Sequence, residues 1–424
     1  MNQRVDPAQL MTKVSAVKRE TVAVLDVGTS KITCLIVELP DASEGENARP
    51  IVIGMGYQIS QGVSAGQITD MVAAERSIRL AVDQAERRAG IKVRKIHVGV
   101  SAIKVVSQLA TAEVTLNGQV ATSEHLSMVL RHAVDELYDA DYDILHAIPV
   151  NYAIDESNGI SDPRGMVGQV MRVNVHIVKA PIGPLQNMRA CIERCHLECE
   201  KLVFSPYASA LASLNQDEMD LGVLHIEMGG GSTSFSVFYE NKPIYIGVVP
   251  VGAHHVTRDL ARGLNIPLAS AERIKNLFGS ALATGEGGHE EIELPNVNDS
   301  AHIVQHHMLT NIIRPRLEET FEMVNAQLER SGLAEFVGRR AVLTGGGAAM
   351  SGARELAQHI LERDVRVATP MRLNGLPDMA TGPAFSASAG IVAYMRRRQT
   401  DQLGELSSEP FIIERIFRWL RRNF

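Results

Sequence analysis

Three glycine-rich turns, each directly after an apolar run, are the parts of the sequence best suited to chemistry. They read DVGTSK (26–31), EMGGGSTS (227–234) and TGGGAAMSG (344–352). Glycine lets backbone N–H groups approach phosphate oxygens closely, and neighbouring Ser or Thr hydroxyls add further hydrogen bonds. None of the three is a Walker A loop or a GxGxxG fingerprint, so P-loop and Rossmann sites are excluded. Taken singly, a glycine turn between two strands more often only closes a β-hairpin.

The composition is that of a globular chain long enough for several domains. It has 424 residues, 45% of them hydrophobic and 21% charged, with a formal net charge of −7. This acidic balance argues against a general nucleic-acid-binding protein, which carries a basic excess. No apolar run reaches the roughly 20 residues that span a bilayer. Residues 1–19 lack the apolar centre of a secretory signal and are predicted to form a flexible polar arm.

The four cysteines fit a reducing compartment. Cys191, Cys195 and Cys199 recur every four residues beside His196, which leaves a metal site open as an alternative. Thiolate sites usually use close CxxC pairs, whereas this spacing repeats one face of a helix, so we favour packed thiols. The histidine pairs at 254–255 and 306–307 have no partners at ligand spacing and are interpreted as surface or packed residues.

Hydrophobic periodicity predicts an α/β chain in which strands and helices alternate. Residues 21–39 and 222–252 have the pattern of β-hairpins with a glycine turn. Helices are predicted over 71–89, with a stop at Gly90, and over 184–196. A mostly helical region follows at 253–332. Within that region, residues 279–300 are glycine-rich and acidic without a period, which predicts a surface loop.

In this order and spacing, the three turns resemble the motifs of the actin/Hsp70/sugar-kinase superfamily. The resemblance covers about residues 20–398 and implies two similar α/β domains that hold ATP between a pair of β-hairpins. KLVFSPYASALASL (201–214) and AFSASAGIVAYM (384–395) resemble the two connecting helices of the hinge. SAERIKNLFG (270–279) resembles the helix whose Glu and Lys reach the ribose and adenine.

The resemblance implies a set of contacts for ATP or ADP and Mg²⁺. The phosphate groups would contact Gly28, Thr29, Ser30, Lys31, Gly229, Gly230, Gly231 and Ser232. The adenosine would contact Glu272, Lys275, Gly345, Gly346 and Gly347. Asp26 and Glu227 would hold the metal through water.

Three positions depart from the superfamily pattern. Asp is usual where this chain has Glu227 and Ser234, so the geometry around the metal would change. Ser205 stands where hydrolysing relatives carry a Glu or Gln that orients the attacking water, and serine is too short for that role. Phosphoryl transfer depends on positioning the nucleophile. The sequence therefore predicts nucleotide binding with at most weak ATPase activity, and no catalytic residue is assigned.

A second resemblance narrows the choice within the superfamily. ILHAIPVNYAIDESNGISDPRGMVG (144–168), inside the insertion 90–167, resembles the inserted subdomain of FtsA, a family of bacterial cell-division proteins. The match extends over nearly the whole chain. It implies an actin-like, two-domain ATPase fold with an FtsA-type inserted subdomain and a C-terminal amphipathic helix.

The FtsA resemblance also implies partners and a location. Such a protein binds ATP, polymerises with itself and anchors the ring of FtsZ, a tubulin-like division GTPase, to the cytoplasmic face of the cell membrane at the septum. Later division proteins would bind through residues 90–167. FtsZ would dock on the helix 303–330, with three exposed side chains near its start: Arg314, Arg316 and Glu319.

The same resemblance gives the expected division of the chain. The segments are a flexible arm 1–19, a domain I core of 20–89, 168–203 and 385–398, an inserted subdomain 90–167, a domain II core of 204–252 and 339–384, a helical subdomain 253–338, a linker 399–410 and a membrane helix 411–424.

The last segment, PFIIERIFRWLRRNF, predicts a helix that lies on a membrane. On a helical wheel, one arc holds Ile412, Ile413, Ile416, Phe417, Trp419, Leu420 and Phe424. The other side carries Arg415, Arg418, Arg421 and Arg422. A helix over residues 411–424 is about 21 Å long, which is too short to span a hydrocarbon core of roughly 30 Å. It should therefore lie in the interface of an anionic bilayer. Docking on the body of the chain or in a partner groove is the alternative.

Two other functions within the superfamily fit the sequence less well. A sugar or small-acid kinase needs a carboxylate base facing its substrate and has no use for a basic amphipathic tail. An Hsp70-like chaperone needs a β-rich peptide-binding domain after the nucleotide domain, where this chain has a linker and one predicted helix.

Overall fold

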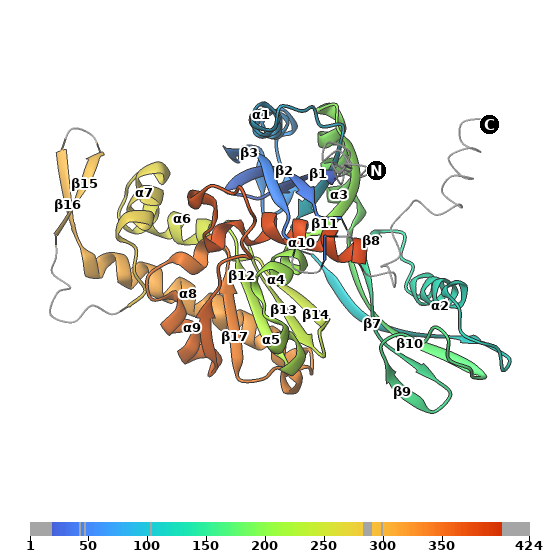
Figure 1. Cartoon of the computed structure of the whole chain (residues 1–424). Coiled ribbons are helices and arrows are strands. Elements are labelled where there is room, and N and C mark those ends of the chain that lie inside the picture. The colour runs from blue at the N-terminus through green and yellow to red at the C-terminus, as the bar shows by residue number, and fades with distance from the viewer. Residues whose placement is uncertain are drawn as a thin grey trace, which may run out of the picture.

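The computed structural model describes residues 19–41, 44–45, 48–101, 104–282, 291–297 and 300–400 (Figure 1). Two α/β domains lie side by side, and the helices α4 (Ser205–Ser213) and α10 (Ser386–Thr400) cross between them. A smaller inserted subdomain extends from one side of this body and a mostly helical subdomain from the other.

Domain I is built on a five-stranded sheet in the order β11-β6-β1-β2-β3. Three strands form an antiparallel meander: β1 (Glu20–Val27), β2 (Lys31–Leu39) and β3 (Ile51–Ile59). Two more, β6 (Lys95–Val100) and β11 (Glu198–Phe204), join in parallel. Helices α1 (Met71–Ala89) and α3 (Ile182–Arg194) pack on one face, and α10 packs on the other. Because both faces are covered, the strands are nearly continuous runs of Val, Ile and Leu.

The ends of α1 follow from its sequence. The Asp70 carboxylate accepts hydrogen bonds from the N–H groups of Val72 and Ala73, both at 3.0 Å, and so caps the first turn. Gly90 ends the helix with a φ of 70°, a left-handed conformation that favours glycine. The predicted helix and its glycine stop are therefore confirmed.

Domain II repeats the plan of domain I with the sheet order β14-β13-β12-β17-β18. The meander consists of β12 (Val223–Met228), β13 (Thr233–Tyr239) and β14 (Lys242–Val249). The parallel strands are β17 (Arg340–Thr344) and β18 (Asp364–Val367). Helices α5 (Gln216–Leu221), α8 (His306–Arg330) and α9 (Ala353–Leu361) pack against this sheet. The two hairpins predicted from the glycine turns are thus equivalent parts of two similar domains.

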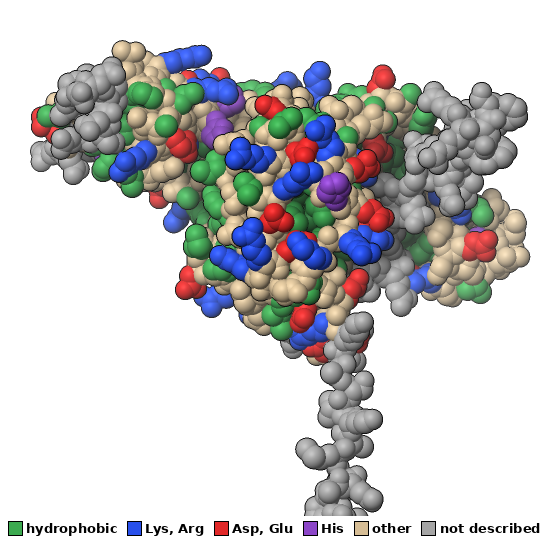
Figure 2. Space-filling model, turned by 90° about the horizontal axis from the view of Figure 1, so that it is seen from above, with side chains coloured by type: hydrophobic (Ala, Val, Ile, Leu, Met, Phe, Trp, Pro, Cys, Tyr) green, Lys and Arg blue, Asp and Glu red, His purple; other side chains and the backbone are tan. Residues whose placement is uncertain are grey.

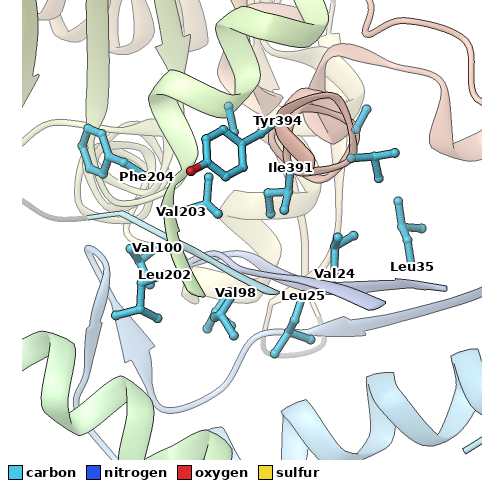
Figure 3. Close-up of a cluster of buried hydrophobic side chains, with 14 of the residues drawn as sticks. Val24, Leu25, Leu35, Val98, Val100, Leu202, Val203, Phe204, Ile391 and Tyr394 are labelled. Carbon is cyan, nitrogen blue, oxygen red and sulfur yellow. The ribbon is translucent and has the colours of Figure 1, made fainter. Parts of the chain in front are cut away.

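The hinge helices are packed against domain I through apolar side chains. Figure 3 shows Ile391 and Tyr394 of α10 beside the strands that carry Val24, Val98 and Val203, and all five side chains are buried. α10 and α4 approach so closely that a Cβ atom on Gly390 would lie 2.0 Å from the carbonyl oxygen of Ala208. Only glycine at this position allows the crossing.

The inserted subdomain has its own sheet in the order β7-β10-β8-β9, with α2 (Ser123–Glu136) packed on it. The strands are β7 (Val106–Thr115), β8 (Tyr142–Ile154), β9 (Ser157–Ile160) and β10 (Val170–Pro181). The expected boundaries 90–167 differ from this at both ends, because β6 belongs to the sheet of domain I and β10 to the inserted sheet. Both strands are apolar runs, so their composition does not show which sheet they join.

The helical subdomain contains α6 (Ala253–Gly263), α7 (Leu268–Phe278) and α8. It also contains a hairpin of β15 (Glu291–Val297) and β16 (Ser300–Gln305), so the predicted surface loop 279–300 is wrong over its last part. Ile292 and Val304 face each other across the ladder and are buried with the core of domain II. The hairpin forms because these two residues, which are separated in the sequence, pair with each other and pack on the core. α8 begins at His306 rather than at the predicted residue 303.

The cysteine segment does not form one helix face. Cys191 lies in α3, Cys195 follows its last residue, and Cys199 lies in β11. Burial raises the pKa values of these thiols to about 11, 12 and 11, which keeps them protonated. Among the described residues, the structure contains no group of three or more His, Cys, Asp or Glu side chains that could hold a metal ion.

On the face shown in Figure 2, the Lys and Arg side chains of the described residues are interspersed with Asp and Glu. In the part of the chain that the structure describes, no helix is both long and apolar enough to cross a membrane. The predicted arm up to residue 18, most of the predicted linker and the predicted membrane helix 411–424 lie outside the described residues.

Replacing Gly390 with Ala should force α4 and α10 apart and lower the free energy of unfolding by about 2–3 kcal/mol. Urea unfolding followed by circular dichroism measures the change. Gly382→Ala is the matched control, because nothing lies within 4 Å of a Cβ atom at that position. Equal unfolding midpoints for the two variants would show that the crossing tolerates a methyl group.

Candidate nucleotide-binding site

The two hairpin turns have the same local geometry and face each other between the domains. In the β1–β2 turn the N–H of Gly28 donates to the carbonyl of Lys31 at 3.0 Å, and in the β12–β13 turn Gly229 donates to Ser232 at 3.0 Å. The turns are in near contact, since a Cβ atom on Gly231 would lie 2.8 Å from the Cα atom of Ala65. The segment that contains Ala65 is bound to the first turn, because the Thr29 hydroxyl accepts a hydrogen bond from the Ala65 N–H at 2.9 Å.

The beginning of α6 sits directly on the second turn. The N–H groups of Ala253 and His254 donate to the carbonyls of Gly229 and Gly230, both at 2.9 Å. The His254 ring then reaches the opposite domain, with 3.0 Å between its Nε2 atom and the Ser30 Oγ atom. Interpreting His254 only as a surface or packed residue therefore missed this contact between the domains. Its position just after Gly252, at the start of a helix, was the available signal.

The third glycine turn lies against the end of β12. Gly345 has a φ of 84°, and a Cβ atom there would lie 2.5 Å from the carbonyl oxygen of Met228. Both conditions require glycine. The Gly345 N–H donates to the carbonyl of Pro383 at 3.1 Å, which ties this turn to the segment before α10.

Together these elements enclose a cleft of about 510 Å³, a volume typical of small-molecule sites. Every residue assigned to phosphate, adenosine or metal from the sequence lines it, and the assignment of these roles stays a prediction. The structure brings them together as Asp26, Gly28, Thr29, Ser30, Lys31, Glu227, Gly229, Gly230, Gly231, Ser232, Glu272, Lys275, Gly345, Gly346 and Gly347. Sequence reasoning missed Tyr57 and Ser101, which line the cleft from outside the motifs. It also gave no role to Asn276, Met350 and Ser351, which line the cleft from within the motifs 270–279 and 344–352.

Two carboxyl groups and one amine lie at the bottom of this cleft. Asp26 is only 6% exposed, and burial raises its pKa. Burial, followed by the negative charge of Asp26, raises the pKa of Glu227 to about 8. Burial also lowers the pKa of Lys31 to about 8, although the two acids oppose this shift. A divalent cation would stabilise both carboxylates, so the arrangement suits a metal–phosphate ligand.

Asp26 and Lys31 are both bound to elements around the hinge. The Asp26 carboxylate accepts from the Ser205 hydroxyl at 3.5 Å and from the Ser388 hydroxyl at 3.3 Å, at the beginnings of α4 and α10. The Lys31 Nζ atom donates to the carbonyl of Ala384 and lies 3.4 Å from the centre of the Phe385 ring. The first hairpin is therefore in contact with both hinge segments.

Two of the predicted adenosine contacts, Glu272 and Lys275, line a wall of the cleft that α7 forms. Lys275 is 6% exposed, and its Nζ atom donates to Glu272 at 2.7 Å, to the Thr257 hydroxyl at 2.9 Å and to the carbonyl of Ala253 at 3.3 Å. Burial would raise the pKa of Glu272, but hydrogen bonds from Lys275 and Thr257 lower it instead. Lys275 is thus already held by three acceptors and acts as a fixed charge in this wall.

The side chains predicted to bind FtsZ lie on α8, outside the residues that line the cleft. Arg314 and Arg316 were expected to be exposed, but both are half-buried. Arg314 pairs with Glu318 at 2.7 Å, because residues four apart are neighbours on a helix. Arg316 pairs with Asp259 of α6 at 2.6 Å and also with Glu319, which is exposed.

Comparison with known proteins identifies a family with this arrangement. Residues 224–390 match the family model for cell division protein FtsA, and residues 103–179 match the model for the SHS2 domain inserted in FtsA. The cell division protein FtsA of Agrobacterium fabrum is 38% identical over 427 aligned residues, covering 97% of this chain and 96% of that protein. The chain belongs to the FtsA family.

Other FtsA proteins align over similar lengths. FtsA of Pseudomonas aeruginosa is 32% identical, with 94% of this chain and 97% of that protein covered. FtsA of Escherichia coli is 29% identical, with 97% and 100% covered. The FtsA resemblance found in the insertion, and its extent over nearly the whole chain, are confirmed.

Solved structures confirm the actin-like fold. A PilM–PilN type IV pilus biogenesis complex has a TM-score of 0.63 at 17% identity, covering 89% of this chain and 99% of the other. MreB5 of Spiroplasma citri bound to ADP has a TM-score of 0.52 at 12% identity, covering 90% and 99%. At such identities, the likeness to this FtsA-family chain concerns the fold.

The raised pKa of Glu227 predicts how stability depends on pH. The folded state favours the protonated carboxyl, so this contribution is present below the ordinary pKa of 4.5 and is lost as the pH rises to about 8. Glu227→Gln should therefore gain stability relative to the unsubstituted chain between about pH 6 and pH 8.5, by about 2 kcal/mol. Thermal melts across this range measure the gap. The exposed Glu124→Gln should show a constant gap, and a constant gap for Glu227→Gln would contradict the prediction.

Proposed function

We propose that the chain binds ATP or ADP with Mg²⁺ in this cleft, polymerises in an actin-like manner and anchors the FtsZ ring to the membrane. Its membership of a cell-division family and its actin-like fold support the general role. One observation carries the nucleotide part: three glycine turns converge on a cleft whose buried floor holds Asp26 and Glu227. Such a site combines backbone N–H groups for phosphates with carboxylates for a hydrated metal.

The nucleotide acts as a conformational ligand and is hydrolysed at most slowly. Ser205 stands where the superfamily resemblance places a water-orienting Glu or Gln, and its hydroxyl is bound to Asp26 at 3.5 Å. It is therefore occupied in holding a carboxylate and is too short to reach a nucleophile in the cleft. A site that lacks the water-orienting group but keeps the phosphate-binding turns favours binding of the nucleotide over its hydrolysis.

Residues 411–424 attach the polymer to anionic lipid at the cytoplasmic face of the cell membrane. Four arginines contribute about 1 kcal/mol each near such a surface, so about 4 kcal/mol in all, and the apolar arc adds to this. Ordering a free segment into a helix costs about 1 kcal/mol per residue before its hydrogen bonds form. One copy therefore binds weakly and reversibly, and polymerisation raises the affinity by roughly a hundredfold through avidity.

Contacts with the division machinery are divided between the two subdomains that extend from the body. FtsZ docks on α8 near Arg314, Arg316 and Glu319, where an acidic peptide would compete with Glu318 and Asp259 for the guanidinium groups. Later division proteins bind the inserted subdomain. The two subdomains extend from opposite sides of the body, and neither α8 nor the sheet of the inserted subdomain contributes residues that line the cleft (Figure 1).

Asp26→Asn should weaken the binding of ADP in the presence of Mg²⁺ by roughly tenfold to a hundredfold. The amide keeps the shape of the carboxyl group and bonds to Ser205 and Ser388, but it removes the charge that would hold the metal water. Isothermal titration with and without Mg²⁺ measures the effect, and the variant should lose most of the magnesium dependence. Glu124→Gln, on the inserted subdomain, is the control. Unchanged affinity in Asp26→Asn would exclude this carboxylate as the metal site.

A chain ending at residue 410 should lose at least roughly tenfold in affinity for vesicles that contain anionic lipid. Co-sedimentation with and without ATP measures the binding, and ATP should increase it only in the full chain. Reversing two charges with Arg421→Glu and Arg422→Glu should remove the preference for anionic over neutral vesicles. Equal binding by the full and the shortened chains would reject the membrane role of residues 411–424.

A further inference from the structure

The inserted subdomain is packed into the body of the protein through β8. Different residues of this one strand enter three apolar clusters, those of domain I, domain II and the subdomain itself. Leu145 and Ile148 belong to the core of domain I, and Val150 packs against the core of domain II. Ala147, Tyr152 and Ile154 belong to the core of the subdomain. β8 thus joins the subdomain to both domains.

His146 lies at the centre of this strand's contact with the hinge. It is 1% exposed, and its Nε2 atom accepts a hydrogen bond from the Phe204 N–H at 2.9 Å. Its ring meets the edge or face of two tyrosines, with centroids 4.9 Å from Tyr207 and 5.5 Å from Tyr394. Tyr207 belongs to α4 and Tyr394 to α10, so one imidazole of the subdomain contacts both hinge helices.

The same two helices begin at the floor of the cleft. Ser205, the first residue of α4, and Ser388, in the first turn of α10, donate to the two oxygens of Asp26. Ser205 directly follows Phe204, whose N–H is bound to His146. Asp26 and His146 are therefore linked through the single peptide step from Phe204 at the end of β11 to Ser205 of α4, and through about two turns of α10.

Domain II takes part in the same network. Tyr207 stacks on Phe238 of β13 with centroids 6.4 Å apart and an interplanar angle of 14°. From the subdomain, the Ser107 hydroxyl accepts from the Ile246 N–H of β14 at 3.0 Å and lies 2.8 Å from the Nε2 atom of His176. The subdomain is consequently held by both domains, and a rotation of one domain against the other must change these contacts.

We propose that His146 is a positioning residue that couples nucleotide binding in the cleft to the orientation of the inserted subdomain. The inference rests on the proposed nucleotide function. Asp26 would hold a hydrated metal at the cost of its bonds to the Ser205 and Ser388 hydroxyls, and the beginnings of α4 and α10 would then shift. Close-packed side chains transmit such a shift because they resist compression. His146 receives it from both helices and passes it to β8, so the surface that the subdomain offers to partners depends on the nucleotide.

A simple packing role for His146 predicts a different result from this coupling. If the residue only fills space, an apolar side chain of similar size should transmit the shift equally well. If it acts through the bond to Phe204, a side chain with an acceptor is required. His146→Gln supplies an amide oxygen that can accept from Phe204, and His146→Leu supplies none. Tyr152→Leu is the matched control, because it also removes a buried ring from β8 but lies in the core of the subdomain.

The experiment measures two quantities on the full chain, ADP affinity in the presence of Mg²⁺ and hydrogen exchange in β7, β10 and α2. We expect ADP with Mg²⁺ to change exchange in these elements at least roughly threefold in the unsubstituted chain. His146→Leu should bind ADP within about threefold of the unsubstituted chain while losing most of that distant response. His146→Gln and Tyr152→Leu should retain it. If His146→Leu does not fold, His146→Met provides an acceptor-poor side chain that adapts better to a core.

Three results would overturn the coupling. The first is a full distant response in the folded Leu or Met variant. The second is ADP binding to the unsubstituted chain without any change in the inserted subdomain. The third is an equal loss of response in Tyr152→Leu, which would show general softening of the subdomain. Absence of ADP binding to the unsubstituted chain would instead reject the proposed function, and the coupling with it.

Discussion

The crossing of α4 and α10 is the constraint on which the other features of the body depend. The two helices touch at Gly390 and Ala208, where a single methyl group would be 2.0 Å from a carbonyl oxygen. This close approach brings Ser205 and Ser388 to the same carboxylate of Asp26, one on each oxygen. It also brings Tyr207 and Tyr394 together around His146. A wider crossing would separate both sets of contacts, since each set draws one residue from each helix.

Burying three titratable side chains at the cleft is costly to the folded state. Burial raises the pKa values of Asp26 and Glu227, and the negative charge of Asp26 adds to the rise at Glu227. Lys31 is the nearby cation, yet burial lowers its own pKa to about 8. At neutral pH these three side chains therefore do not all carry their full charge, and burying them lowers the free energy of unfolding. A divalent cation with a phosphate would satisfy the carboxylates and the amine together, so the folded state would gain stability from such a ligand.

Local sequence patterns were sufficient for most strands, the glycine turns and most helices. The residues around the cleft were also predictable, because the order of three turns resembles one superfamily and each turn carries its own residues. Contacts between distant segments were not predictable. His254 reaches Ser30 across 224 residues, and Ile292 pairs with Val304 to make a hairpin from a segment that reads as a loop. The assignment of β6 and β10 to different sheets depends on such partners too, because an apolar strand fits either sheet.

The contacts of His146 are the clearest example of a feature that could not be predicted from a single sequence. Its neighbours in β8 are apolar, and a lone histidine among them resembles any other packed residue. The position of His146 is defined by its contacts with Phe204, Tyr207 and Tyr394. These residues are 58 or more positions away and belong to three different elements. The hinge is the place where the cleft, both domains and the inserted subdomain meet within the reach of a few side chains.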